Sequence, residues 1–139
     1  MSELNAPTAA REEHDILVGM IARRISIPTW IVTTNLAREA PVPCPTSPSG
    51  SAYPDIVAHE KFTRRLAAVG EVETTTTLAT DRAELWATSA RLAPRFFLYA
   101  PEESEAAVRA ILAAHRIRPT GLFLYRHTEK NTFIVRRAR

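Results

Sequence analysis

The sequence predicts an α/β fold in which helices flank a central mixed sheet. The chain has 139 residues, a length typical of one domain with its own core, so we expect a single domain over residues 1–139. It begins with a helical pattern that is followed by β-branched, strand-like segments. Its second half alternates strand-like with helical segments, as is typical of parallel crossovers.

The first part of the chain predicts a helix and then a strand. Residues 1–9 are expected to form a flexible leader. Residues 11–26 are expected to form a helix because their apolar side chains recur at helical spacing, and Pro28 follows as a stop signal. The β-branched and aromatic residues of 30–36 predict the first strand.

A Pro/Ser-rich segment, residues 37–53, comes next and predicts a long loop. Proline cannot donate the backbone hydrogen bonds that a strand or helix needs. A linker between two domains is the competing interpretation. It is disfavoured because the 36 residues before the segment are too few for a stable domain.

Two further strands are predicted at residues 55–60 and 66–77, with a turn at 61–65 between them. Threonine favours strands, so we expect its run at the end of the second segment to belong to that strand. The three strands predicted so far can form an antiparallel meander.

The remaining elements alternate between helix and strand. Asp81 and Glu84 form a capping pattern for a helix that ends before Pro94, and the apolar residues 96–100 predict a buried strand. A second helix starts after Ser104. The sequence then predicts a strand and offers a candidate for one more: 121–126 and 132–135.

Three carboxylates are predicted to converge on one face of the sheet. A turn centred near Thr63 places Asp55 opposite Glu71, and Glu73 faces the same side because it lies two residues further along the strand. Carboxylates this close repel one another unless a cation offsets their charge. Mg²⁺ prefers such oxygen ligands, and bound water on a metal is a starting point for hydrolysis.

The segment Tyr53-Pro54-Asp55, followed after 15 residues by Glu71-Val72-Glu73, resembles the motif of PD-(D/E)XK nucleases. The predicted order of elements over about residues 12–125 also resembles the restriction-endonuclease-like core of that family, α-β-β-β-α-β. The resemblance implies a Mg²⁺- or Mn²⁺-dependent nuclease that hydrolyses phosphodiester bonds, with DNA as the expected nucleic acid.

The resemblance also implies roles for individual residues. Asp55, Glu71 and Glu73 would be catalytic. The implied metal ligands are four acids: Asp55, Glu71, Glu73 and Glu13. Glu73 stands where the family usually has lysine, so it would bind metal or orient water, or a basic residue such as Lys61 or Arg82 would replace the lysine. The predicted contacts with nucleic acid are basic: Arg64, Arg65 and Arg82.

Composition and charge limit which other classes of protein the sequence could encode. The net charge of +3 and a pI of about 9.5 favour a polyanionic partner only mildly. A single cysteine excludes an intramolecular disulfide, and no apolar run is long enough to span a membrane. Without a recognisable secretory signal, we expect a cytoplasmic protein.

Other interpretations remain open at this point. The same fold could serve as a non-catalytic domain that binds nucleic acid or a protein partner, or as a structural protein. A homodimer or a larger complex is also compatible with so small a nuclease. Asp55 could merely cap the entry to its strand, and Glu71 and Glu73 could form a solvated polar face.

Overall fold

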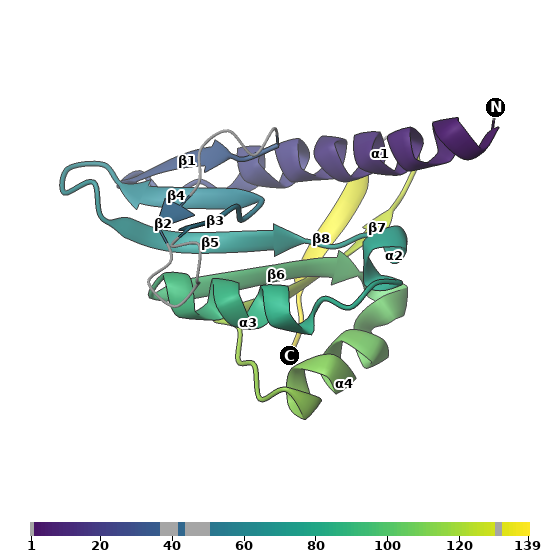
Figure 1. Ribbon diagram of the computed structural model, residues 1–139. Coiled ribbons are helices and arrows are strands. Elements are labelled where there is room, and N and C mark those ends of the chain that lie inside the picture. Colours follow the sequence, from purple (N-terminus) through teal and green to yellow (C-terminus); the bar gives the residue numbers. More distant parts are fainter. Residues whose placement is uncertain (1, 37–41, 44–50, 130–131) are drawn as a thin grey trace.

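The computed structural model describes the backbone of residues 2–36, 42–43, 51–129 and 132–139, and the side chains of 11–36, 52–129 and 132–139. A central sheet carries helices on both faces (Figure 1). None of the described helices combines the length and the apolar character that crossing a membrane requires.

The elements follow one another in nearly the predicted order. They are α1 (Ser2–Arg24), β1 (Trp30–Thr34), β2 (Val42–Pro43), β3 (Ser51–Ala52), β4 (Ile56–Glu60), β5 (Leu66–Val72), α2 (Thr75–Leu78), α3 (Ala83–Leu92), β6 (Arg95–Pro101), a 3-10 turn (Glu102–Ser104), α4 (Glu105–Ala114), β7 (Gly121–His127) and β8 (Phe133–Arg137). The short elements β2, β3 and α2 were not predicted.

The main sheet is mixed, as predicted. Its six strands lie in the order β1-β4-β5-β6-β7-β8. β1, β4 and β5 form the expected antiparallel meander. β5, β6 and β7 run parallel to one another, and β8 runs antiparallel to β7. The candidate strand at residues 132–135 is therefore real and forms one edge of the sheet.

The register of the β4–β5 hairpin is the predicted one over most of its length. Ile56 pairs with Gly70 and Ala58 with Ala68, and the register shifts by one residue only at His59 near the turn. This pairing places Asp55, just before β4, beside Glu71 near the end of β5.

Each face of the sheet has its own apolar core. On one face, α1 packs onto residues from several strands: Leu17, Val18 and Ile21 contact a cluster that contains Ile56, Val72, Tyr99, Tyr125 and Phe133. On the other face, α3 and α4 cover a second cluster: Val69, Trp86, Phe96, Leu98, Ala100, Val108, Leu112, Ile117, Leu122 and Leu124. The prediction of helices on both sides is confirmed.

Two predicted boundaries differ from the structure in the N-terminal half. α1 begins at Ser2 and so includes the predicted leader, because Ala, Arg and Glu are strong helix formers even where they show no apolar stripe. Within the predicted loop 37–53, β2 and β3 pair with each other as two-residue strands. The remainder of that loop up to residue 50 lies outside the described residues.

The prediction of a strand over 66–77 is wrong at its C-terminal end. β5 stops at Val72, and Thr74 caps the short helix α2. The Thr74 hydroxyl accepts a hydrogen bond from the Thr77 amide, and the Thr77 hydroxyl accepts one from the Thr74 amide. This reciprocal capping offers the backbone partners that outweigh the strand preference of threonine.

Candidate functional site

Asp55 links the two strands of the hairpin to α1. Its Oδ2 accepts a hydrogen bond of 2.9 Å from the Val72 amide, just past the last paired residue of the hairpin. The same oxygen lies 3.2 Å from His14 Nε2 on α1. Asp55 thus has the structural role of holding a strand end, and it is also partly exposed.

Glu71 lies beneath Asp55 on the face of the sheet that α3 covers. Its side chain is almost completely buried, and Ser89 Oγ donates a hydrogen bond of 2.9 Å to its Oε1. Burial, then the charge and hydrogen bond of Asp55, raise the pKa of Glu71 well above its usual value. Glu71 therefore holds a proton more readily than an exposed glutamate does.

Glu73 is fully buried and is held on both oxygens. Arg82 Nε lies 2.9 Å from Oε2, and Arg82 Nη2 donates to Oε1 at 3.0 Å. Trp86 Nε1 donates to Oε1 at 3.2 Å, and the Thr77 hydroxyl donates to Oε2 at 2.7 Å. The alternative of a solvated polar face is wrong for Glu71 and Glu73.

Asp55 and Glu73 both act on Glu71. The hydrogen bond and charge of Asp55 and the charge of Glu73 raise the pKa of Glu71. The arrangement differs from three ligands around one point because Glu73 turns towards Arg82. Among the residues whose side chains are described, no group of three His, Cys, Asp or Glu residues has a geometry suited to one metal ion.

A polar pocket of about 510 Å³ opens above Asp55. It lies between α1, the end of β1 and the region from α2 to α3. Its lining residues are mostly polar: Arg11, His14, Asp15, Asn35, Leu36, Tyr53, Asp55, Thr76, Thr77 and Arg82. Asp55 is the only one of the three predicted catalytic acids that lines it, since Glu71 and Glu73 lie behind this wall.

Cations surround Asp55 at the pocket. The hydrogen bond to Asp55, together with the negative charges of Asp55 and Asp15, raises the pKa of His14 to about 9 against the opposing effect of burial. His14 is therefore a cation at neutral pH. With Arg11 and Arg82 it gives the pocket three basic groups, which would attract a phosphate group.

The other predicted site residues lie apart from this pocket. Glu13 lines two hollows on the side of α1 that faces β7 and β8, near Tyr125 and His127. Arg64 and Arg65 lie in the β4–β5 turn, at the opposite end of those strands. Of the basic residues considered, Arg82 alone reaches the pocket.

His14 is the site residue that the sequence analysis did not select. The signal was its helical phase: His14 lies three, four and seven residues before Leu17, Val18 and Ile21, which face the sheet. A histidine on the buried stripe of a helix needs a polar partner. Here that partner is Asp55, forty-one residues away in sequence.

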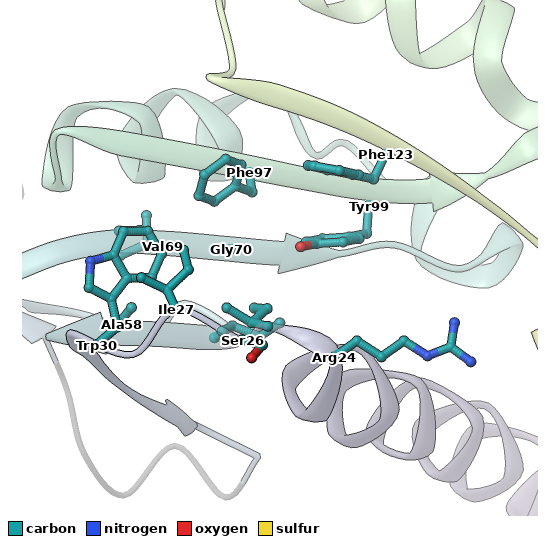
Figure 2. A pocket seen from close by; sticks show the side chains of 13 residues that line it. Arg24, Ser26, Ile27, Trp30, Ala58, Val69, Gly70, Phe97, Tyr99 and Phe123 are labelled. Carbon is teal, nitrogen blue, oxygen red and sulfur yellow. The ribbon is translucent and has the colours of Figure 1, made fainter. Parts of the chain in front are cut away.

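A second pocket, of about 240 Å³, lies on the sheet face that carries α1 (Figure 2). Ala58, Ala68 and Gly70 form part of its lining, and Figure 2 shows the rings of Phe97, Tyr99 and Phe123 along one side. No carboxylate or imidazole lines it. It therefore lacks the groups that acid–base or metal-assisted hydrolysis requires.

The site accordingly consists of Asp55 and His14 at a polar pocket, Glu71 behind Asp55, and an Arg82–Glu73 pair at the pocket wall. Comparisons with protein-family models, with curated proteins and with solved structures find no match to this chain.

Proposed function

We propose that the chain is a metal-dependent nuclease of the restriction-endonuclease-like type and that it hydrolyses phosphodiester bonds at the pocket above Asp55. The observation that carries the proposal is the contact between Asp55, which lines a pocket with a basic rim, and Glu71, which lies behind Asp55. The order helix, three antiparallel strands, crossover helix and parallel strand supports it as well.

Asp55 and Glu71 would hold a Mg²⁺ or Mn²⁺ ion. Two carboxylates are sufficient, because Mg²⁺ at phosphate-processing sites commonly takes one or two protein carboxylates and completes its shell with water and substrate oxygens. The raised pKa of Glu71 fits this role, since the cation that contacts the pair of acids, His14, contacts Asp55 and not Glu71. Such an ion supplies an activated water and stabilises negative charge on the phosphate.

Arg82 would take the place of the missing lysine. Its Nε and Nη2 face Glu73, so Nη1 is left to contact a phosphate in the pocket that Arg82 lines. Glu73 is then a positioning residue: it fixes the plane of the guanidinium, and it touches neither substrate nor ion. A fixed guanidinium loses less conformational entropy when it binds a phosphate oxygen.

The test is cleavage by the purified protein of single-stranded and duplex DNA and RNA with Mg²⁺ or Mn²⁺. Asp55→Asn and Glu71→Gln should each lower the rate by at least about 100-fold, because each removes a charged ligand while keeping the shape of the side chain. Glu84→Gln, an exposed acid on α3, is the matched control and should cleave like the unmodified protein. Thermal unfolding verifies that each variant is folded.

A second function is favoured by a specific observation, the complete burial of Glu71 and Glu73 behind the pocket wall. In this alternative the chain is a non-catalytic domain of the same fold that binds nucleic acid through the basic pocket rim. Salt-sensitive binding without cleavage of any of these substrates would select this alternative. Cleavage that survives Asp55→Asn would exclude the proposed site.

A further inference from the structure

The tip of the β4–β5 hairpin exposes an aromatic ring. Phe62 is 84% exposed, more than any other large apolar residue whose side chain is described. The hairpin reaches beyond the rest of the sheet at the left of Figure 1. A phenylalanine left in water forgoes about 1.5–3 kcal/mol of possible burial, so this position is costly unless a partner covers the ring.

The tip is held in a defined conformation. The Thr63 hydroxyl donates a hydrogen bond of 2.7 Å to Glu60 Oε2, and the Arg65 amide donates to the Thr63 hydroxyl at 3.2 Å. The Arg64 amide closes the turn by donating to the Glu60 carbonyl at 2.9 Å. The ring of Phe62 is therefore presented on a fixed turn.

Arg64 occupies a backbone conformation that favours glycine. Its φ of 64° lies in the left-handed region, where a side chain costs about 1–2 kcal/mol relative to glycine. A turn that needed only to reverse the chain would be more stable with glycine or asparagine there. An arginine in this conformation is consistent with use of its side chain.

Basic residues gather at the end of the sheet that carries the tip. Four segments lie at this end, where β5, β6 and β7 begin: 29–30, 58–68, 90–97 and 114–121. They contain seven of the chain's 18 basic residues, all exposed: Lys61, Arg64, Arg65, Arg91, Arg95, Arg116 and Arg118. We call this surface the basic end.

The charge of the basic end is almost uncompensated. Glu60 is the only acid in these four segments, and it is engaged by Thr63. Among the described residues, none of the seven cations forms an ion pair. The surface is therefore complementary to a polyanion.

We propose that the basic end binds nucleic acid, with Phe62 stacking on an unpaired base while Lys61 and Arg65 contact the flanking phosphates. Fixed aromatic rings among cations are the usual means of holding single-stranded nucleic acid. The choice of nucleic acid among polyanions rests on the proposed function. One exposed ring is a small apolar area for anchoring to a membrane. Stable binding to a membrane surface normally requires the apolar face of a whole helix or two separate anchors.

The basic end and the candidate site lie at opposite ends of the same strands. From Asp55 to Glu60 the strand rises by about 16 Å at 3.3 Å per residue. A bound strand that follows β4 would therefore connect Phe62 with the candidate site. The hairpin would determine where along the strand the pocket acts.

The experiment measures binding of labelled single-stranded and duplex oligonucleotides at several salt concentrations, in chelator so that cleavage plays no part. Phe62→Ala should weaken single-strand binding by about 5- to 100-fold and leave its salt dependence unchanged. The double variant Lys61→Gln/Arg65→Gln should lower the slope of log K against log salt by about 1.4, or 0.7 for each phosphate contact. Fluorescence of a 2-aminopurine base should change on binding of the unmodified protein and much less with Phe62→Ala.

Matched controls lie elsewhere on the surface. Ile134→Ala removes another exposed apolar side chain, and Arg126→Gln removes an exposed cation near Glu102. Both should bind like the unmodified protein.

The outcomes separate this proposal from the proposed function. Tip-dependent binding without any cleavage supports the basic end and contradicts the nuclease. Cleavage and binding that are unaffected by all three tip substitutions overturn the inference. Phe62-dependent binding to vesicles of phosphatidylcholine and phosphatidylserine, with none to oligonucleotides, overturns it as well and assigns the tip to a membrane surface.

Discussion

Glu73 and Arg82 illustrate how one buried acid is accommodated. Glu73 has no exposed surface, and Arg82 is about a quarter exposed, so the pair joins the interior to the pocket. The indole of Trp86 and the hydroxyl of Thr77 complete the hydrogen bonds of the carboxylate. Every partner of the Glu73 carboxylate comes from the short stretch that follows β5, whereas its backbone is bonded to Tyr99 and Tyr125.

Arg82→Met should therefore destabilise the protein by about 3 kcal/mol, since it leaves a buried carboxylate without its cation. Adding Glu73→Gln to it should recover part of the loss, because the uncompensated charge is then gone. Urea denaturation of the two single variants and the double variant measures the coupling. Arg109→Met, which breaks an exposed pair with Glu105, is the control and should cost less than about 1 kcal/mol. Equal losses at the two arginines would contradict the assignment of a buried pair.

At the scale of elements, α1 is fixed to the sheet by two different kinds of contact. Its middle turns bury Leu17, Val18 and Ile21 against the sheet. One turn earlier, His14 is hydrogen-bonded to Asp55. The second contact depends on pH because the imidazole must be protonated to form the ion pair.

The stability of the fold should fall as the pH rises through about 9 when no metal ion is present. The pKa of His14 is about 9 in the folded protein and 6.5 ordinarily, so the folded state binds the proton more tightly. This contribution is fully present below about pH 6.5 and is lost progressively up to about pH 9; it amounts to no more than about 3 kcal/mol. The free energy of unfolding from urea titrations in chelator should show this decline.

His14→Gln should remove the decline, whereas His115→Gln should keep it. His115 is exposed at the C-terminal end of α4, so it is a suitable comparison. A decline that is the same in all three proteins would show that His14 is not the titrating group.

At the scale of the whole molecule, charge separates along the strands. The acids Asp55, Glu71 and Glu73 lie at one end of β4 and β5, and the basic end lies at the other. Like charges that lie close together oppose the compact state, so a ligand that offsets either group should stabilise the fold.

Mg²⁺ or Mn²⁺ should therefore raise the midpoint of thermal unfolding. At a free ion concentration about a hundredfold above Kd, the gain is about 2.7 kcal/mol if the ion binds only the folded state. Asp55→Asn should abolish the shift, and Glu84→Gln should preserve it. Calorimetry in which Asp55→Asn and the unmodified protein respond alike to the ion would count against a metal site at Asp55.

The sequence by itself determined the order of the main elements and the register of the hairpin. Hydrophobic periodicity and the positions of Pro28 and Pro94 mark the element ends, because these signals act within a few residues. The hairpin register followed from the turn at 61–65, and it placed Asp55 beside Glu71 without any knowledge of the rest of the fold.

Only the tertiary structure decided how the site is completed. The pairing of His14 with Asp55 and of Arg82 with Glu73 depends on where α1 and α3 lie against the sheet, which long-range packing decides and sequence spacing does not. The sequence pattern also could not predict where β5 ends, because reciprocal hydrogen bonds between Thr74 and Thr77 outweigh the strand preference of threonine. Local patterns fix which residues form an element, and the packing of elements fixes which side chains meet.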